Sequence, residues 1–208
     1  MIGRDKIRWG ILGTGRRAGQ FAQALRETTR GALVAVGSRS RETADLFGAT
    51  FGIPRRHGSY EALLDDPDVD ALYIATPHAA HAQWAIRGAE AGKHLLVERP
   101  LALNSAEGMA IVEAARQNDV FLMEGGAFRY HPQVERLTDL LAQRAVGEIT
   151  LIRAACGFRA AVPPGNRLFD NRLGGGSILE LGGDLVALAC RAAAAALRTE
   201  TAEPLDLF

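Results

Sequence analysis

The stretch "IRWGILGTGRRA", residues 7–18, decides the fold. Its first six residues form an apolar, β-prone run, and a glycine-rich turn and a helical pattern follow directly. Gly13, Gly15 and Ala18 match the spacing G-x-G-x-x-G/A. In that pattern the first glycine permits a tight turn, the second lets a pyrophosphate approach the backbone, and the small third residue lets the helix pack closely on the strand. The strand before the turn and the helix after it favour dinucleotide binding over the alternative, a glycine-rich turn without a ligand.

The helix after this turn is expected to begin near Arg16. Its first N–H groups and its partial positive charge then point at the phosphates of the dinucleotide. We therefore expect the cofactor to contact Gly13, Thr14, Gly15, Arg16 and Arg17.

Strand and helix patterns alternate through the first 125 residues. Further apolar runs lie at 32–37, 70–75, 94–98 and 120–124. Most of them are almost continuously apolar, as in parallel strands that helices cover on both faces. The alternation predicts βαβ units and an α/β fold with a doubly wound parallel sheet.

Polar residues mark where several of the intervening helices begin. Ser40 can cap the helical run that follows it. Thr76 stands before Pro77, which is typical of a cap residue followed by a proline at the first helical position. Asn104, with Glu107 three residues later, resembles a capping box.

The pattern changes after about residue 125, where we expect a second domain. The run 131–149 predicts an amphipathic helix that ends near Gly147, and residues 150–158 alternate loosely, like one strand of an antiparallel sheet. A loop then leads into a helical run at 177–197. A lone strand cannot form a stable sheet, so this domain is either incomplete or completed by a partner. The expected domains are 1–125 and 126–208.

Composition excludes several classes of partner. The 208 residues are 48% hydrophobic and 23% charged, with a formal net charge of zero, which gives no reason to expect a nucleic acid or an acidic membrane surface as partner. No apolar run approaches the roughly 20 residues of a membrane-spanning helix, and the N-terminus lacks the apolar segment of a signal peptide. Cys156 and Cys190 have neither paired nor metal-type spacing, so we interpret them as two small buried thiols of a cytoplasmic protein.

The end of the second predicted strand indicates which dinucleotide binds. An NAD site usually presents Asp or Glu there, about 20 residues after the glycines, to bind the ribose 2′-OH. This sequence instead has Gly37-Ser38-Arg39-Ser40, without a carboxylate. Ser38 can donate a hydrogen bond, and Arg39 can hold a phosphate with its planar fork of donors. We therefore expect NADP rather than NAD, with a solvent-exposed Arg39 before the helix as the alternative.

Several motifs, in a fixed order, carry a family resemblance. They are "IRWGILGTG", "SRS", "YEALLDDPDVDALYIATPHAAHAQWAIRGAEAGKHLLVERPLAL", "LMEGGAFRYHPQ", "GEI" and "GGGSILELGG". With them, residues 7 to 188 resemble the Gfo/Idh/MocA oxidoreductases, in particular the dihydrodiol/xylose dehydrogenase-like members. The resemblance implies a Rossmann domain followed by an α+β domain whose open antiparallel sheet covers the substrate and often forms the subunit interface. Because the chain stops soon after the second-domain helix, we expect that α+β domain to be incomplete. Its uncovered sheet edge would then favour a homo-oligomer.

The resemblance also assigns residues to the cofactor. "ATPHAAHA" is similar to the loop beside the nicotinamide ribose, and "VERP" falls on the family's E-K-P, whose lysine is catalytic. "FRYHP" matches an aromatic-x-Arg-x-x-Pro segment that contacts cofactor or substrate. Two histidines three apart could suggest a metal, but no third ligand is in view, so we expect none. The implied cofactor contacts are Thr76, Pro77, His78, His81, Glu98, Arg99 and Arg129.

The three implied catalytic positions all depart from the family pattern. Arg99 replaces the lysine, Glu180 replaces an aspartate, and Asp184 replaces a histidine or tyrosine. Arginine stays protonated in proteins, so Arg99 can polarise a carbonyl or orient a hydroxyl but cannot act as the base. Glu180 and Asp184 are then the candidates for proton transfer, a step that typically contributes ~10² to 10⁴ in rate.

Two functions are compatible with this sequence. The first is an NADP-dependent oxidoreductase that transfers a hydride between nicotinamide and a carbinol carbon of a small-molecule substrate, namely a sugar, polyol or dihydrodiol. The second is a catalytically weakened NADP-binding protein that serves as a sensor, a partner subunit or the remnant of an enzyme. The glycine-rich turn that is expected to bind the cofactor is compatible with both functions, and the altered catalytic positions favour the second.

Overall fold

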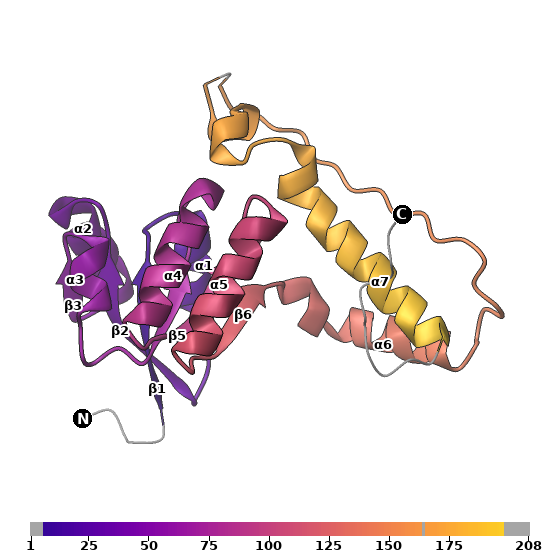
Figure 1. Ribbon diagram of the computed structural model, residues 1–208, viewed down its shortest axis with the longest axis horizontal. Helices are drawn as coiled ribbons and strands as arrows, with labels where there is room; N and C mark the ends of the chain where they lie inside the picture. The colour runs from indigo at the N-terminus through magenta and orange to yellow at the C-terminus, as the bar shows by residue number, and fades with distance from the viewer. Residues whose placement is uncertain (1–5, 164, 198–208) are drawn as a thin grey trace. The chain divides into compact units, whose positions relative to one another are not determined.

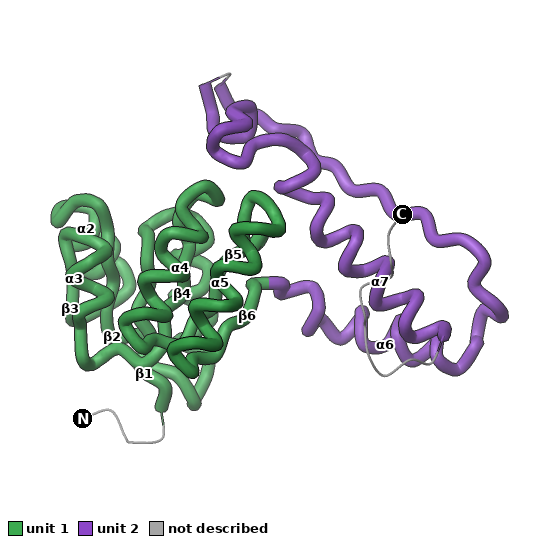
Figure 2. Tube along the Cα trace, viewed as in Figure 1, with its two compact units in different colours: residues 1–125 green, residues 126–208 purple. Residues whose placement is uncertain are grey.

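The computed structural model describes residues 6–163 and 165–197 (Figure 1). The chain divides into two compact units, residues 1–125 and residues 126–208 (Figure 2), and each unit is described by itself. The run 198–208, which has no clear period in the sequence, lies outside the described residues. In the described part of the chain, no helix combines the length and the apolar character that crossing a membrane requires.

Unit 1 is built on a six-stranded parallel sheet, which confirms the predicted α/β fold class. The strand order is β3-β2-β1-β4-β5-β6. From the central pair β1 and β4 the chain order runs outwards in both directions, which is the doubly wound topology. The strands are β1 (Ile7–Leu12), β2 (Gly31–Gly37), β3 (Arg55–His57), β4 (Ala71–Ile74), β5 (His94–Glu98) and β6 (Leu122–Gly125).

The edge strand β3 is not among the predicted strands. It consists of Arg55, Arg56 and His57, whose polar side chains form no apolar run. Parallel backbone pairing with residues 35–37 of β2 makes this segment a strand. Its position at the edge of the sheet leaves one side of the strand unpaired by the sheet, which suits polar side chains.

Helices cover both faces of the sheet (Figure 1). Helices α1 and α2 bury apolar side chains in one cluster with Ile11, and α3, α4 and α5 do so in a second cluster with Leu12. These neighbouring residues of β1 enter opposite clusters because side chains alternate across a strand. The helices are α1 (Arg16–Leu25), α2 (Arg41–Phe51), α3 (Tyr60–Leu64), α4 (His81–Glu90) and α5 (Ser105–Gln117).

Two of the predicted helix caps are confirmed. The Ser40 side chain accepts a hydrogen bond from the backbone N–H of Thr43, so α2 begins where the sequence indicates. Asn104 Oδ1 accepts from the N–H of Glu107 at 3.0 Å. The Glu107 carboxylate reaches back to the N–H of Leu103 at 3.1 Å, one residue before the Asn104 cap, so the start of α5 has a variant of the predicted capping box.

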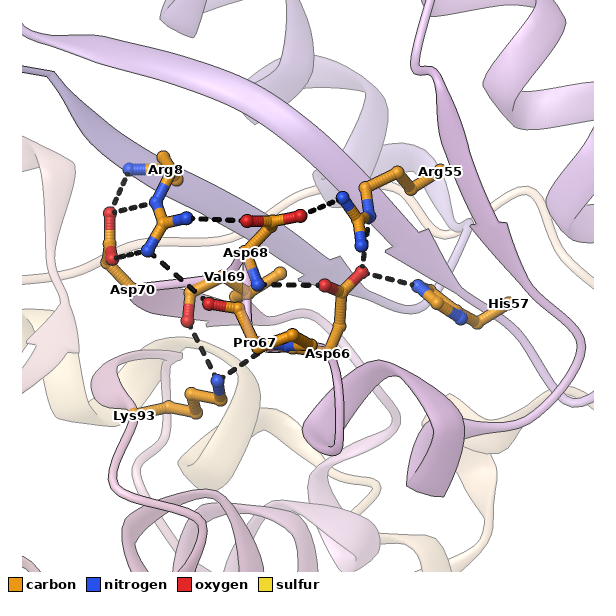
Figure 3. Close-up of polar contacts among 9 residues, drawn as sticks. All are labelled: Arg8, Arg55, His57, Asp66, Pro67, Asp68, Val69, Asp70 and Lys93. Carbon is orange, nitrogen blue, oxygen red and sulfur yellow. Dashed lines mark hydrogen bonds and ion pairs between the residues drawn. The ribbon is translucent and has the colours of Figure 1, made fainter. Parts of the chain in front are cut away.

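A network of ion pairs holds the loop before β4 at the amino-terminal ends of β1 and β4 (Figure 3). The nearly fully buried Asp66 lies 2.8 Å from Arg55 Nε and 2.9 Å from His57 Nε2. Asp70 accepts from Arg8 through the guanidinium at 2.6 Å and through the backbone N–H at 2.8 Å. Arg8 and Asp70 lie at the amino-terminal ends of β1 and β4, so this part of the network stabilises the fold away from the glycine turn. Its other members are Pro67, Asp68, Val69 and Lys93.

The regular elements in the described residues of unit 2 are helices. Helix α6 (Pro132–Ala142) packs against α7 (Gly183–Leu197), and Arg191 Nε donates a hydrogen bond to Thr138 Oγ1 at 3.1 Å. The helix predicted to end near Gly147 ends at Ala142, and turns carry the chain to Gly147. The sequence therefore predicts this helix correctly but makes it too long.

The predicted strand at 150–158 is wrong, because the structure assigns no strand to residues 149–163. A strand needs a neighbour to satisfy its backbone, and the described part of unit 2 supplies none. Cys156 lies in this extended segment and is exposed, while Cys190 is half-buried. The interpretation of both cysteines as buried thiols is therefore also wrong.

Candidate dinucleotide-binding site

The carboxyl ends of β1, β4 and β5 lie at one edge of the sheet, beside the point where the strand order reverses. The turn after β1 contains residues 13–15, the turn after β4 contains Thr76, and the turn after β5 contains Arg99. In doubly wound sheets ligands bind at this position. Three segments predicted from the sequence are thus brought to the same edge.

The turn after β1 is shaped around two glycines. Gly13 has a φ of +109°, and a Cβ at this residue would lie 2.9 Å from the carbonyl oxygen of Ala75. Its N–H donates to the carbonyl of Gly37 at 3.0 Å, which ties the end of β1 to the end of β2. Gly15 has an extended backbone, and a Cβ there would meet nothing within 4 Å among the described residues. The backbone at Gly15 therefore borders open space that a ligand can enter.

The amino-terminal end of α1 has the properties of an anion site. Within the described chain, no side chain caps this helix at Gly15, and its first turn contains no acidic residue. Arg16 and Arg17 begin the helix, so side-chain charge adds to the helix dipole and to the uncapped N–H groups. Ala18 is fully buried, as the predicted close packing of this helix on the sheet requires.

Arg17 connects this end of the site with the end of β5. Its Nε lies 3.9 Å from Glu98 Oε2, and Glu98 Oε1 accepts a hydrogen bond from the Tyr73 hydroxyl at 2.6 Å. Burial, together with the Glu98 carboxylate, raises the pKa of Tyr73 well above its usual range, so Tyr73 is a neutral donor. Tyr73 also stacks on Phe21 of α1 with ring centroids 4.0 Å apart. These contacts join α1, β4 and β5.

At the end of β2 the two predicted residues differ in accessibility. Ser38 is buried, and its hydroxyl forms a short hydrogen bond with Thr43 Oγ1. Arg39 is exposed and hydrogen-bonds the hydroxyl of Tyr60 from α3. Burial raises the pKa of Tyr60 although Arg39 lowers it, so the phenol stays protonated. Arg39 is therefore the accessible cation at the strand end where an NAD site usually has a carboxylate.

The predicted helix cap at Thr76 is wrong. Pro77 precedes a short 3₁₀ helix, η1 (His78–Ala80), and α4 begins only at His81. Thr76 Oγ1 is buried and has no hydrogen-bond partner among the described residues. An unsatisfied buried hydroxyl costs roughly 1–3 kcal/mol, so a ligand atom that bonded to it would be favoured. This hydroxyl and the open turn at Gly15 both fit a dinucleotide bound along the edge of the sheet.

Both predicted histidines are buried. His81 is 0% exposed, and its ring nitrogens lie 2.8 Å from the carbonyl oxygen of Pro100 and 2.9 Å from that of Thr76. The His78 ring lies beside it, with centroids 5.6 Å apart. Among residues 6–163 and 165–197, no three His, Cys, Asp or Glu side chains gather into a group that could hold a metal ion.

A family model described as an oxidoreductase family with an NAD-binding Rossmann fold, GFO_IDH_MocA, matches residues 7–126. This match covers more than half of the chain. The chain belongs to the Gfo/Idh/MocA oxidoreductase family. The matched residues include the glycine turn, the Thr76 loop and the Arg99 loop.

Individual relatives in the Gfo/Idh/MocA family are similar over most of this chain. The trans-1,2-dihydrobenzene-1,2-diol dehydrogenase of Xenopus laevis is 38% identical over 177 residues, 84% of this chain and 53% of that protein. The enzyme of the same name from Danio rerio is 39% identical over 178 residues, 85% of this chain and 53% of that protein. The chain therefore spans about half the length of the curated relatives it matches.

Solved structures agree with this assignment. The 3-ketoreductase KijD10 from Actinomadura kijaniata, in complex with NADP and TDP-benzene, matches with a TM-score of 0.76 and 32% identity over 92% of this chain and 57% of that one. An NAD-binding protein from Listeria innocua matches with a TM-score of 0.75 and 26% identity over 89% of this chain and 54% of that one.

The remaining Gfo/Idh/MocA positions lie in unit 2. Arg129 is in the 3₁₀ helix η2 (Ala127–Tyr130), Glu180 is in the π-helical turn η5 (Ile178–Gly182), and Asp184 is in the first turn of α7. The Arg167 guanidinium donates to both carboxylate oxygens of Glu180, at 3.0 and 3.4 Å. Arg99 belongs to unit 1, so the three predicted catalytic residues are divided between the two units.

Two polar residues near the carboxyl edge of the unit 1 sheet, Tyr73 and Glu124, are not among the residues that the sequence singles out. Tyr73 lies within an apolar run and Glu124 ends another, so the sequence pattern indicates only that both belong to strands. Glu124 Oε1 accepts a hydrogen bond from the N–H of Leu101 at 2.9 Å, two residues after Arg99. The available signal was their position, because a polar group near the carboxyl end of a parallel strand faces the ligand edge of such a sheet.

Proposed function

We propose that this chain binds NADP at the carboxyl edge of the unit 1 sheet and that the protein is an NADP-dependent oxidoreductase. Its reaction moves a hydride between nicotinamide and the carbinol carbon of a sugar, polyol or dihydrodiol. The observation that carries the proposal is the uncapped amino end of α1 beside the open backbone of Gly15. The names of the relatives, dihydrodiol dehydrogenases and a 3-ketoreductase in complex with NADP, support the substrate class and the cofactor.

Each binding residue has a distinct part in this proposal. The first N–H groups of α1, with Arg16 and Arg17, hold the pyrophosphate. Arg39 holds the 2′-phosphate with its guanidinium, since it is the exposed cation after β2. The unsatisfied Thr76 hydroxyl binds the ribose at the nicotinamide end. When bound, the nicotinamide supplies or accepts the hydride.

Arg99 orients the substrate oxygen in the proposed reaction. Its guanidinium stays protonated, so it stabilises negative charge on that oxygen and leaves proton transfer to a carboxylate. Glu180 and Asp184 are the candidates. Glu180 is held by Arg167, whose guanidinium contacts both of its carboxylate oxygens.

A second candidate function is NADP binding without efficient turnover. The observation that favours it is Arg99 itself, which occupies the position of the family's lysine and cannot act as a base. Both candidates share the same cofactor site, so cofactor affinity and turnover have to be measured separately.

The cofactor site is tested by Gly15→Ala. A Cβ at Gly15 meets no atom of the residues that the structure describes, so the fold should tolerate it, yet it occupies the space that a pyrophosphate needs. We expect NADPH affinity, from fluorescence titration, to fall at least about tenfold, which is about 1.4 kcal/mol of binding free energy. Gly108→Ala in α5 is the matched control, since a Cβ there also meets nothing within 4 Å in the described structure. Equal affinities for both variants and the parent would refute the site.

Turnover then separates the two candidates. NADPH oxidation and NADP reduction are followed with a panel of carbonyl sugars, aldoses, polyols and dihydrodiols. Turnover that disappears in Gly15→Ala establishes the oxidoreductase. Tight NADPH binding without turnover on any member of the panel establishes the second candidate instead.

A further inference from the structure

We propose that His81 and Glu124 are positioning residues that hold the Pro100–Leu101 peptide group from both sides and thereby fix the backbone of Arg99. The inference deepens the proposed function, because it concerns the loop that carries the proposed substrate-orienting residue. It also gives His81 a different role from the cofactor contact that the sequence suggested.

His81 holds one side of this peptide group. Nδ1 lies 2.8 Å from the Pro100 oxygen, and Nε2 lies 2.9 Å from the Thr76 oxygen. Carbonyl oxygens only accept hydrogen bonds, so each ring nitrogen has to donate for both bonds to form. A neutral imidazole carries one N–H and can satisfy only one of them, whereas the imidazolium satisfies both. Both hydrogen bonds therefore form together only when the ring is doubly protonated, which is the state that the proposal requires.

Glu124 holds the other side. Its Oε1 accepts from the Leu101 N–H at 2.9 Å. The Pro100 oxygen and the Leu101 nitrogen belong to the same planar peptide group, so two side chains fix the orientation of a single rigid unit. In that state the cation lies at the negative end of the peptide dipole and the carboxylate at its positive end, which strengthens both hydrogen bonds.

These two residues come from elements on either side of the loop. His81 begins α4 and also reaches the turn after β4 through Thr76, while Glu124 lies in β6, which pairs with β5. On the amino-terminal side of Arg99, Tyr73 holds Glu98 through its 2.6 Å hydrogen bond. Hydrogen bonds thus hold Glu98 before Arg99 and the Pro100–Leu101 peptide group after it. The backbone that presents its guanidinium is fixed by three neighbouring elements.

Other titratable and charged groups surround this arrangement. His78 of η1 lies against the His81 ring, and Glu98 and Arg99 lie on the loop itself. A second cation at His78 would oppose the charge on His81, and Glu98 would favour it. The charge state of the His81 ring therefore has to be observed directly.

The first test uses the ligand-free parent chain, so that it does not depend on cofactor binding or turnover. Nitrogen-15 NMR of the histidine side chains near neutral pH, assigned with His81→Gln, reports how many ring nitrogens of His81 carry a proton. We expect both. A ring with one proton would overturn the arrangement, even if NADPH binds as proposed.

The second test asks whether the peptide group positions Arg99. Glu124→Ala removes the acceptor, whereas Glu124→Gln keeps an acceptor oxygen at the same place. In Glu124→Ala we expect hydrogen exchange at the Leu101 amide to accelerate about tenfold, the scale of one lost hydrogen bond to a charged group. We also expect the Arg99 Nε–H resonance, assigned with Arg99→Lys, to shift. Glu124→Gln should restore both signals towards those of the parent.

Two results would contradict this role. If Glu124→Ala lowers only the melting temperature and leaves the Arg99 resonance in place, Glu124 is purely structural. If Glu124→Ala does not fold, Glu124→Gln alone tests the role. This variant keeps the acceptor oxygen, so a displaced Arg99 resonance in Glu124→Gln would also exclude the proposed role. Where turnover is measurable, Glu124→Ala should lower kcat about tenfold and leave the KM for NADPH within about twofold.

Discussion

The Tyr73 hydroxyl donates a 2.6 Å hydrogen bond to Glu98, the residue directly before Arg99. The other carboxylate oxygen of Glu98 lies 3.9 Å from Arg17 in the first turn of α1. One carboxylate is therefore shared between the phosphate end and the nicotinamide end of the proposed cofactor site. Tyr73 can serve as its donor across the working pH range because burial and Glu98 both raise the pKa of the phenol.

Tyr73→Phe removes this donor while the ring stays stacked on Phe21. We expect the free energy of unfolding, measured by urea denaturation, to fall by about 1.5–3 kcal/mol, since the lost bond is to a charged group. Phe21→Leu, which removes the stacking and keeps the hydroxyl, is the companion variant. An unchanged denaturation midpoint for Tyr73→Phe would show that the hydrogen bond does not stabilise the fold.

Arg39→Asp tests the choice of cofactor. We expect the variant to lose roughly 10- to 100-fold in NADPH affinity, the scale of a lost charge-assisted hydrogen bond, and to lose much less in NADH affinity. The control is Arg41→Asp, which makes the same change of charge two residues later, where Arg41 pairs with Asp45 on the surface of α2. Equal losses for NADPH and NADH in Arg39→Asp would refute the 2′-phosphate assignment.

Arg99→Lys tests whether arginine limits turnover. Lysine can lose its proton in a buried site and arginine cannot, so we expect turnover to rise, by up to ~10²-fold if the lysine recovers general-base chemistry. Arg87→Lys, at the surface ion pair with Glu61, serves as the control and should leave turnover unchanged. A slower Arg99→Lys enzyme would mean that this chain uses arginine by preference.

Asp66 makes stability depend on pH at the far edge of the sheet. Burial opposes its ionisation, but the Asp68 N–H, His57 and Arg55 together hold its pKa below the usual range. Because the folded pKa is lower than the unfolded value of about 3.9, the stabilisation is complete above about pH 4 and is lost as pH falls through the folded pKa. Asp66→Asn should therefore flatten this part of the acid denaturation curve.

At pH 7 we expect Asp66→Asn to reduce the free energy of unfolding by about 1.5–3 kcal/mol, because it weakens buried hydrogen bonds to charged partners. Asp45→Asn, at the exposed pair with Arg41, should cost under about 0.5 kcal/mol. Urea denaturation at pH 7 and near pH 3 measures both variants. Parallel pH profiles for the parent and Asp66→Asn would remove Asp66 as a source of acid sensitivity.

The sheet of unit 1 could be predicted from the sequence because its central strands are buried on both faces and read as apolar runs. β3 could not, because Arg55, Arg56 and His57 form a strand only through backbone pairing with β2. The prediction of a strand at 150–158 is wrong for the opposite reason. It has the alternation of a strand, but the described chain gives its backbone no partner.

The glycine turn could also be predicted, because its requirements are local: Gly13 needs a positive φ, and Gly15 needs an open approach. The surroundings of Arg99 depend on residues distant in the sequence. His81 of α4 and Glu124 of β6 hydrogen-bond to the same peptide group. No spacing along the chain predicts that these two residues lie close together. Local geometry is thus readable from the sequence here, and side-chain convergence across strands is not.

Both buried clusters of unit 1 draw only on residues between Trp9 and Leu122, and all six strands end by Gly125. The residues that form the proposed cofactor site at the carboxyl edge of this sheet, together with its core, are therefore contiguous in the sequence. Everything after Gly126 can be exchanged without removing one of these six strands, a residue of the two buried clusters or the glycine turn. A chain organised in this way can change its chemistry by recombination at one junction and keep the same cofactor module.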